Sequence, residues 1–204
     1  LLVDEILHEY EWGYIRPRTN PSQYFSDLKS LISILKRERL SPEKFLEEVD
    51  KEISFFKQDP ESISTRGETK GQIKKEIEKK IESLERTKEV VEFYRIYEDL
   101  KKERSLMDYD DVLEYAVKIV EVSESARGDI RETYQYILID EHQDSSGVQN
   151  AFLRALWQET ERPNIFVVGD DRQLIYGFSG ASLSYFEDFA TAFGKAQLIT
   201  LSEN

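Results

Sequence analysis

The sequence contains no cysteine among its 204 residues. A disulfide framework and a thiolate metal site are therefore both excluded. The absence is typical of proteins from a reducing compartment, and it supports the expectation of a cytoplasmic protein.

Long apolar runs are also absent. No stretch approaches the roughly 20 apolar residues that a helix needs to cross a bilayer. The N-terminus lacks the basic-then-apolar order of a signal peptide, so we expect no membrane partner. The chain opens with Leu1-Leu2-Val3 and not with an initiator Met, which leads us to expect a processed chain or an excised fragment.

Positive charge is in deficit. The chain has 28 Lys and Arg against 41 Asp and Glu, a net charge of −13. Nucleic-acid binders usually carry a basic face that neutralises phosphates. The charge therefore argues against tight DNA binding by this chain alone, although a local basic stripe or basic surface elsewhere in a longer protein would restore it. The 11 Tyr and 11 Phe argue against disorder.

The first half of the sequence has the patterns of helices. Asn20-Pro21-Ser22 is a helix start signal, and Ser41 with Pro42 predicts an N-cap followed by proline at the first helical position. Residues 57–71 are polar and contain proline and glycine, as in a loop. Residues 72–104 contain neither and predict one long amphipathic helix. A helix packed on its predecessors is favoured over a coiled-coil arm because the apolar seam is short.

A further helix is predicted to begin at Asp108-Tyr-Asp-Asp111. Carboxylates at a helix start suit the helix dipole, so we prefer capping to a metal site there. The face expected to be buried consists of Val112, Leu113, Tyr115, Ala116, Ile119 and Val120.

After Gly128 the pattern changes to short apolar runs. Strands are predicted at 136–139, 165–168 and 197–201, with helices at 148–159 and 182–193 between them. Strand, helix, strand, helix, strand is the order of a parallel α/β sheet with buried strands. We therefore expect a helix-rich α/β fold.

Acidic residues follow two of these strands. Asp140 and Glu141 end the first, and Asp170 and Asp171 end the second. Ligands of open parallel sheets bind beyond the carboxyl ends of the strands, so the two clusters should meet at one edge. Carboxylates there suit Mg²⁺, and the second acid of a pair can activate a water that attacks phosphorus. The competing interpretation is that Asp140 and Asp170 only cap turns.

A glutamine follows each acidic cluster. Gln143 and Gln173 lie two or three residues after the acids. A glutamine can donate to a phosphate oxygen and accept from a water. We interpret His142 as a spacer or a supporting contact, because no second ligand at metal spacing accompanies it. Tyr176 and Phe178 could stack on nucleic-acid bases or pack in the core, and the residues alone do not decide.

Two motifs resemble those of the UvrD/Rep/PcrA helicases of superfamily one. Residues 140–144, Asp-Glu-His-Gln-Asp, are similar to their Walker B segment, D-E-x-Q-D. Residues 168–181 resemble their motif III, V-G-D-x-x-Q-x-I-Y-x-(F/W)-R-G-A. The spacing of about thirty residues also matches. Residues 106–113 resemble the (L/M)-D-F-D-D-L segment upstream of the Walker B segment, and residues 198–204 resemble the strand before the N-Y-R motif.

The resemblance implies a fold and an activity. Residues 1–105 would be a helical insertion subdomain, and residues 106–204 a partial RecA-like ATPase domain with a three-stranded parallel sheet. The chain would be a fragment of an ATP-dependent DNA helicase, 3′→5′ in polarity, acting in DNA repair or recombination. Its partners would be single-stranded or partly duplex DNA and the rest of the helicase chain.

The resemblance also implies roles for the acids and glutamines. Asp140 would hold Mg²⁺ and Glu141 would share the metal site and activate the attacking water. Gln143 and Asp170 would support the nucleotide site, and Gln173 would sense the γ-phosphate of ATP.

On the DNA side, Tyr176 and Phe178 would face single-stranded DNA, with Phe178 as the stacking platform. Asp110 and Asp111 would lie near the DNA path without an assigned role. Ser179 replaces the usual Arg and removes one cation from the DNA side.

No G-x-x-x-x-G-K-(S/T) loop occurs in the sequence, so we expect the fragment alone to be inactive. The first alternative is a non-catalytic nucleic-acid or protein-binding module that retains a helicase-like shell. A stand-alone Mg²⁺-dependent phosphohydrolase ranks last, because the glutamines and residues 176–178 would have no purpose in it.

Overall fold

A computed structural model of the chain describes residues 2–65, 70–157, 160, 163–170, 185, 189–194, 196–197 and 199–200. The described residues are helix-rich and contain eight α-helices and one small parallel sheet. Contacts divide the chain into two compact units, which are described separately. Unit 1 comprises Leu1–Leu35 and Leu40–Met107, and unit 2 comprises Lys36–Arg39 and Asp108–Asn204.

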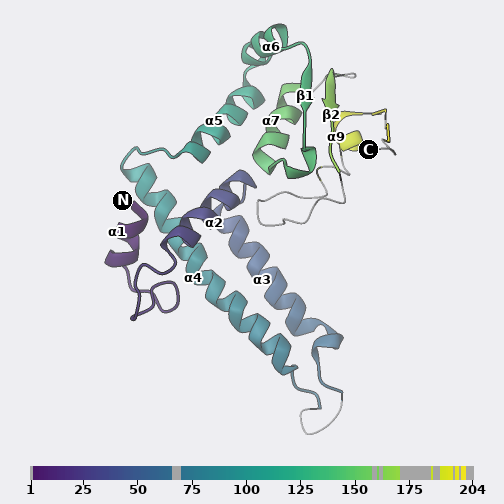
Figure 1. Ribbon diagram of the computed structural model, residues 1–204. Coiled ribbons are helices and arrows are strands. Elements are labelled where there is room, and N and C mark those ends of the chain that lie inside the picture. Colours follow the sequence, from purple (N-terminus) through teal and green to yellow (C-terminus); the bar gives the residue numbers. More distant parts are fainter. Residues whose placement is uncertain are drawn as a thin grey trace. The chain divides into compact units, whose positions relative to one another are not determined.

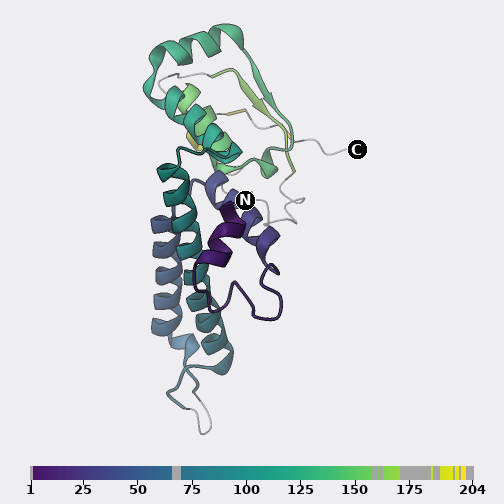
Figure 2. The same ribbon diagram turned by 90° about the vertical axis from the view of Figure 1, so that its left-hand side faces the viewer.

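Unit 1 is built from helices (Figure 1). They are α1 (Leu2–Glu9), all but the last two residues of α2 (Phe25–Arg37), α3 (Pro42–Gln58), the 3₁₀ turn η1 (Pro60–Ser62) and α4 (Lys75–Glu103). The two longest helices, α3 and α4, lie side by side (Figure 2).

The start of α3 follows the sequence prediction. The Ser41 hydroxyl accepts the Lys44 N–H at 3.3 Å, and Pro42 occupies the first turn. Helix α4 begins at Lys75, three residues later than expected, because an antiparallel bridge between Ile63 and Ile73 closes the connection first. Its packing on α3 and α1 confirms the packed helix over the coiled-coil arm.

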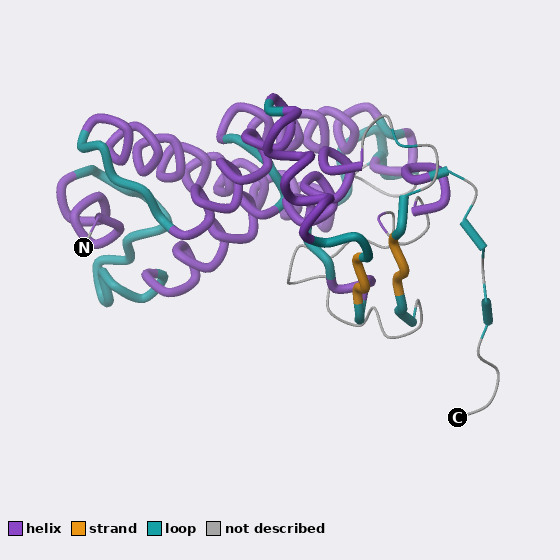
Figure 3. The backbone as a smooth tube through the Cα atoms, turned by 90° about the horizontal axis from the view of Figure 1, so that it is seen from above, coloured by secondary structure: helices purple, strands orange, loops and turns teal. Residues whose placement is uncertain are grey.

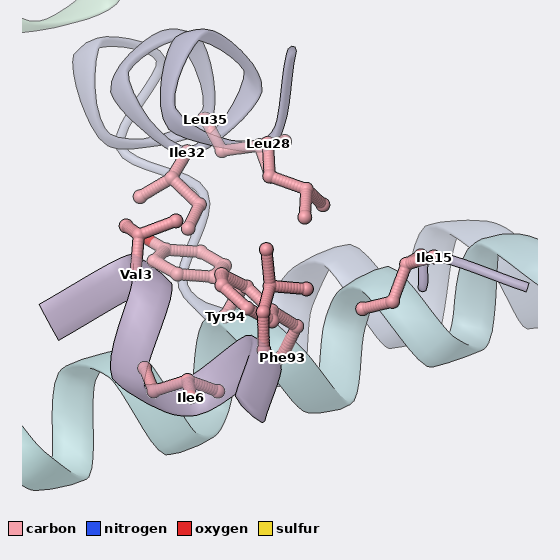
Figure 4. Packing of buried hydrophobic residues seen from close by; sticks show 9 residues of the cluster. Val3, Ile6, Ile15, Leu28, Ile32, Leu35, Phe93 and Tyr94 are labelled. Atoms are coloured by element: carbon pink, nitrogen blue, oxygen red, sulfur yellow. The ribbon is translucent and has the colours of Figure 1, made fainter. Parts of the chain in front are cut away.

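The core of unit 1 is one contiguous apolar cluster. Phe93 and Ile6 are fully buried, and side chains from α1, α2 and α4 point toward one another around them (Figure 4). Glu89 of α4 also accepts the backbone N–H groups of Tyr14 and Ile15 at 2.7 and 2.8 Å. The irregular segment after α1 is thereby fixed to the long helix.

Unit 2 combines helices with the sheet. Its described elements are α5 (Tyr109–Val122), α6 (Glu124–Thr133), β1 (Ile137–Ile139), the 3₁₀ turn η2 (His142–Asp144), α7 (Gly147–Trp157), β2 (Ile165–Val167) and α9 (Phe189–Phe193). The strands β1 and β2 run side by side and are parallel (Figure 3).

The start of α5 is a capping box, as the acidic sequence predicts. The Asp108 carboxylate accepts the Asp111 N–H and the Asp111 carboxylate accepts the Asp108 N–H, both at 2.9 Å. This pair provides hydrogen-bond acceptors for two N–H groups that have no partner within the helix.

The predicted buried face of α5 was partly wrong. Val112, Tyr115 and Ile119 are about half exposed, whereas Val117 and Val120 are buried. The apolar residues cover more than half of the circumference of this helix, so periodicity alone does not determine which of them face α7.

The sheet is smaller and more exposed than predicted. Two of the three expected strands form, but the described residues among 197–201 are not in a strand. Leu138 is 77% exposed and Phe166 is 55% exposed. We expected both faces of the sheet to be buried, and this expectation is wrong for the face that carries Leu138 and Phe166.

Within the described ranges, no helix combines the length and the apolar character needed to cross a membrane.

Candidate functional site

The carboxyl ends of β1 and β2 lie at the same edge of the sheet. Ile139 pairs with Val167 in parallel register. Beyond the strands, the Val168 N–H donates to the Ile139 carbonyl at 2.8 Å, and the His142 N–H donates to the Val168 carbonyl at 2.9 Å. The segments after the two strands therefore stay together for several residues.

Gln143 joins these two segments through its side chain. It is 2% exposed. Its Nε2 donates to Glu141 Oε2 at 2.6 Å, and its Oε1 accepts the Asp170 N–H at 3.1 Å. Three predicted site residues are thus brought together by one buried amide. Both ends of the amide are thus hydrogen-bonded within the protein.

Glu141 has a left-handed backbone, with φ 49° and ψ 45°. This conformation is unfavourable for a residue with a side chain, by about 1–3 kcal/mol, and persists only where the surroundings enforce it. Here Asp140 Oδ1 accepts the Glu141 N–H at 2.9 Å. The backbone strain lies at the residue that the sequence predicts to be catalytic.

Asp140 and Glu141 are both exposed, whereas the two residues after them are buried. Exposed carboxylates at a strand end are the hard oxygen donors that Mg²⁺ takes, usually one or two per ion with waters completing the shell. The donor set therefore fits a magnesium ion carried in with a phosphate substrate.

The carboxylates border a pocket of about 600 Å³. Asp140, Glu141 and Asp144 lie on its polar side. Its other walls are apolar side chains of α5 and α7, among them Val117, Val148 and Phe152.

His142 lies behind the exposed acids and is fully buried. Its Nδ1 is 3.2 Å from the Ser145 hydroxyl, and its ring meets Phe189 edge to face at 5.4 Å between centroids. Burial lowers the pKa of His142, which favours the neutral ring. The position fits the interpretation of His142 as a supporting contact.

Several predicted residues cannot be placed. Asp171, Gln173, Tyr176 and Phe178 lie outside the described residues, so their predicted roles depend on the sequence alone.

Asp110 and Asp111, which had no assigned role, form ion pairs. Arg37 Nε is 3.0 Å from Asp110, and Lys36 Nζ contacts Asp108 at 2.6 Å and also Asp111. The cation next to the capping box is therefore a lysine, in agreement with the preference for capping over a metal site.

Sequence reasoning missed the turn from Lys36 to Arg39. Within unit 2, Glu38 accepts the Gly147 N–H, the first of α7, at 2.9 Å and the Tyr185 hydroxyl at 3.0 Å. The only signal in the sequence is four consecutive charged residues at the end of an amphipathic helix, a pattern that normally indicates a solvated helix end.

Comparison with known proteins identifies the family of this chain. Residues 6–194 match the model of the family described as the UvrD/REP helicase N-terminal domain. The match includes the acidic segment, both strands and the unit 1 helices from the second half of α1 onward.

Three relatives illustrate the similarity. The chain is 39% identical over 121 residues to an ATP-dependent helicase/nuclease subunit of Lactococcus lactis subsp. lactis (strain IL1403). It is 36% identical over 121 residues to the exonuclease/helicase subunit RexA of Lactococcus lactis subsp. cremoris (strain MG1363). It is 39% identical over 106 residues to an ATP-dependent helicase/nuclease subunit of Clostridium acetobutylicum.

These alignments cover 57%, 57% and 48% of this chain, and 10%, 10% and 8% of the relatives. This chain thus spans about a tenth of the length of the relatives it matches.

Proposed function

Because this chain belongs to the family of UvrD/REP helicase N-terminal domains, we propose that it acts as part of an ATP-dependent DNA helicase. Its acidic strand ends would form one side of the ATP site. The names of its relatives, which are helicase/nuclease and exonuclease/helicase subunits, support this assignment.

The observation that carries the proposal is that Gln143 joins Glu141 to Asp170 at one sheet edge, with Asp140 accepting the Glu141 N–H beside them. Adjacent carboxylates beyond a parallel strand are suited to phosphoryl transfer, in which the protein mainly positions the reactants and stabilises charge. Asp140 is the residue that would ligate Mg²⁺, with Glu141 sharing the site. When bound, the ion neutralises charge on the phosphates.

Glu141 would be the general base. A water positioned by its carboxylate loses a proton to it as the water oxygen bonds to the γ-phosphorus. The bond from that phosphorus to the bridging oxygen of ADP breaks, and the bridging electron pair leaves with ADP. The hydrogen bond from Gln143 holds the carboxylate in place, and the strained Glu141 backbone keeps it at the strand end.

The proposed contacts with DNA are argued from the sequence motifs alone. Gln173 would report the γ-phosphate to the DNA track, and Tyr176 and Phe178 would contact single-stranded DNA, with base stacking on Phe178. Residues 1–105 would form the helical insertion subdomain and residues 106–204 the part of the RecA-like domain that carries both motifs. DNA translocation with 3′→5′ polarity belongs to the same proposal.

The test is Glu141→Gln in the complete helicase that contains this chain. We expect ATP turnover to fall by at least about 10²-fold, because the amide cannot accept the proton, while ATP binding persists. Steady-state ATPase assays with single-stranded DNA and ATP-binding titrations measure the two effects. The exposed Glu132→Gln on α6 is the matched control. An unchanged ATPase rate in Glu141→Gln would refute the role of Glu141.

For residues 1–204 alone we expect neither ATP hydrolysis nor unwinding, because the sequence offers no loop of the G-x-x-x-x-G-K-(S/T) type to bind the phosphates. Robust DNA-stimulated ATPase activity from this chain would contradict that expectation.

A further inference from the structure

Three segments distant in sequence converge on the carboxylate of Glu38. Glu38 Oε1 accepts the Gly147 N–H at 2.9 Å, and Glu38 Oε2 accepts the Tyr185 O–H at 3.0 Å. Each carboxylate oxygen thus has its own donor. We name the set of Glu38, Gly147 and Tyr185 the Glu38 junction.

The Glu38 junction is closely packed. A Cβ atom added to Gly147 would lie 2.7 Å from the Tyr185 hydroxyl oxygen, 3.1 Å from Glu38 Oε2 and 3.2 Å from the Arg37 carbonyl. A side chain at residue 147 would therefore displace the hydroxyl or the carboxylate. Glycine is required here for close approach.

The Glu38 side chain is presented by a turn that α5 fixes. Lys36 Nζ, with a side chain 7% exposed, pairs with the capping-box carboxylates Asp108 and Asp111. Arg39 has φ 56° and forms a two-pronged pair with Glu114 at 2.9 and 3.0 Å. Because the residues on both sides of Glu38 are ion-paired to one helix, its position is fixed by contacts other than those with α7 and Tyr185.

The segments that meet at the Glu38 junction flank the candidate site in the sequence. Gly147 begins α7, three residues after the acidic segment ends at Asp144. Tyr185 follows the region of the second motif, and four residues further on Phe189 packs against His142. The junction therefore connects the chain just after the first motif with the chain just after the second.

We propose that Glu38 is a positioning residue that couples the acidic segment to the region of the second motif, by holding the start of α7 and Tyr185 on one carboxylate. This role rests on the proposed helicase function. It adds a residue outside both motifs to the machinery that links ATP hydrolysis to DNA.

The chemistry of the donors agrees with a persistent contact. Burial and the neighbouring Glu38 carboxylate raise the pKa of Tyr185 to about 12, while Arg154 acts in the opposite direction. The phenol therefore stays protonated at neutral pH and donates to Glu38.

The experiment compares Glu38→Gln, Tyr185→Phe and the double variant in the complete helicase. The exposed Glu47→Gln on α3 is the control. We expect each single variant to lower kcat of the DNA-stimulated ATPase by about tenfold, with KM for ATP unchanged within twofold, as a loss of coupling predicts. In the double variant, kcat should be no more than about twofold below that of the single variants, because each single substitution already removes the same contact. A kcat within twofold of the parent, or a KM that changes as much as kcat, would overturn the proposal.

A second readout does not depend on turnover. In the 204-residue chain labelled with ¹³C-tyrosine, the Tyr185 resonance is assigned by its loss in Tyr185→Phe. Its pKa should fall below about 12 in Glu38→Gln, because the carboxylate no longer disfavours the phenolate, and should stay above 10.0, because burial, the larger cause, remains. If that pKa stays at its parent value, the contact does not form and the junction is wrong. If the parent helicase lacks DNA-stimulated ATPase while the pKa falls as expected, the junction stands and the proposed function fails.

Discussion

The two units of this chain are stabilised in different ways. Unit 1 buries one contiguous apolar cluster that includes Ile6, Leu28 and Phe93. Among the described residues of unit 2, the apolar cluster is smaller, with Val120, Ala155 and Leu156 as its buried members. The same part of the unit also buries polar and charged groups, such as Gln143, His142 and Arg127.

This difference has an energetic consequence. Apolar burial is non-directional and tolerates small shifts, whereas a buried polar group is stabilising only while its partner is in place. Arg127, for example, donates to the carbonyls of Val120 and Glu121 at 2.8 and 3.1 Å. We therefore expect unit 1 to be destabilised most by substitutions that remove buried side-chain volume. Unit 2 should be destabilised most by substitutions that remove a hydrogen-bond or ion-pair partner.

The largest effect on stability should come from Phe93→Ala in unit 1. Truncation of a fully buried phenylalanine removes apolar contacts and leaves a cavity, at a cost of about 3–5 kcal/mol in free energy of unfolding. Amide hydrogen exchange in α1 and α4 measures the loss. Phe55→Ala, at a side chain 62% exposed on α3, should cost less than about 0.5 kcal/mol. Equal losses for the two variants would contradict the description of unit 1.

The next effect should come from Lys36→Met in unit 2. The apolar part of the side chain is kept, but Asp108 and Asp111 lose the cation between them. A partly buried carboxylate pair without its cation should cost about 2–3 kcal/mol, measured by exchange of the α5 amides. The control is Lys51→Met, which removes an exposed pair with Glu48 and should cost less than about 0.5 kcal/mol. If Lys36→Met were as mild as the control, ion pairing would not be what fixes this turn.

Gln143→Ala should have a smaller effect on stability and a clear effect on the site. It leaves the Asp170 N–H and the Glu141 carboxylate without their common partner, which should cost about 1–2 kcal/mol. In the complete helicase, kcat for ATP should fall while KM changes little, because Glu141, the proposed base, is misplaced and the nucleotide is not. Exposed Gln135→Ala is the control. A rise in KM alone would indicate that Gln143 contacts the nucleotide.

A similar difference, between local patterns and tertiary partners, explains which features of the structure could be predicted from the sequence. The cap at Ser41, the capping box at Asp108 and the two strands with acidic ends depend on local patterns, and all of them appear in the structure. That Glu141 and Asp170 lie at one edge of the sheet, joined through Gln143, followed from a general rule about parallel strands. These features need only short-range chemistry or known topology.

The features that were predicted wrongly or missed depend on contacts with residues distant in the sequence. The buried face of α5 depends on where α7 lies, and the exposure of Leu138 depends on what covers the sheet. The contacts of Glu38 join residues more than 100 positions apart. No local pattern distinguishes a carboxylate that accepts two such bonds from one in solvent.

The smallest effect should come from Tyr185→Phe, and its pH dependence tests whether the polar contacts of unit 2 are as specific as we argue. The lost hydrogen bond should cost about 1 kcal/mol at pH 8. Because the pKa of Tyr185 is raised from 10.0 to about 12 in the folded chain, the tyrosine stabilises fully below pH 10. Its contribution declines between pH 10 and 12, as the unfolded state loses its phenol proton first. The difference in unfolding free energy between parent and Tyr185→Phe should therefore shrink across that interval, measured by urea titration at each pH. A constant difference from pH 8 to 12 would contradict the raised pKa of Tyr185, and with it a phenol that is buried beside the Glu38 carboxylate.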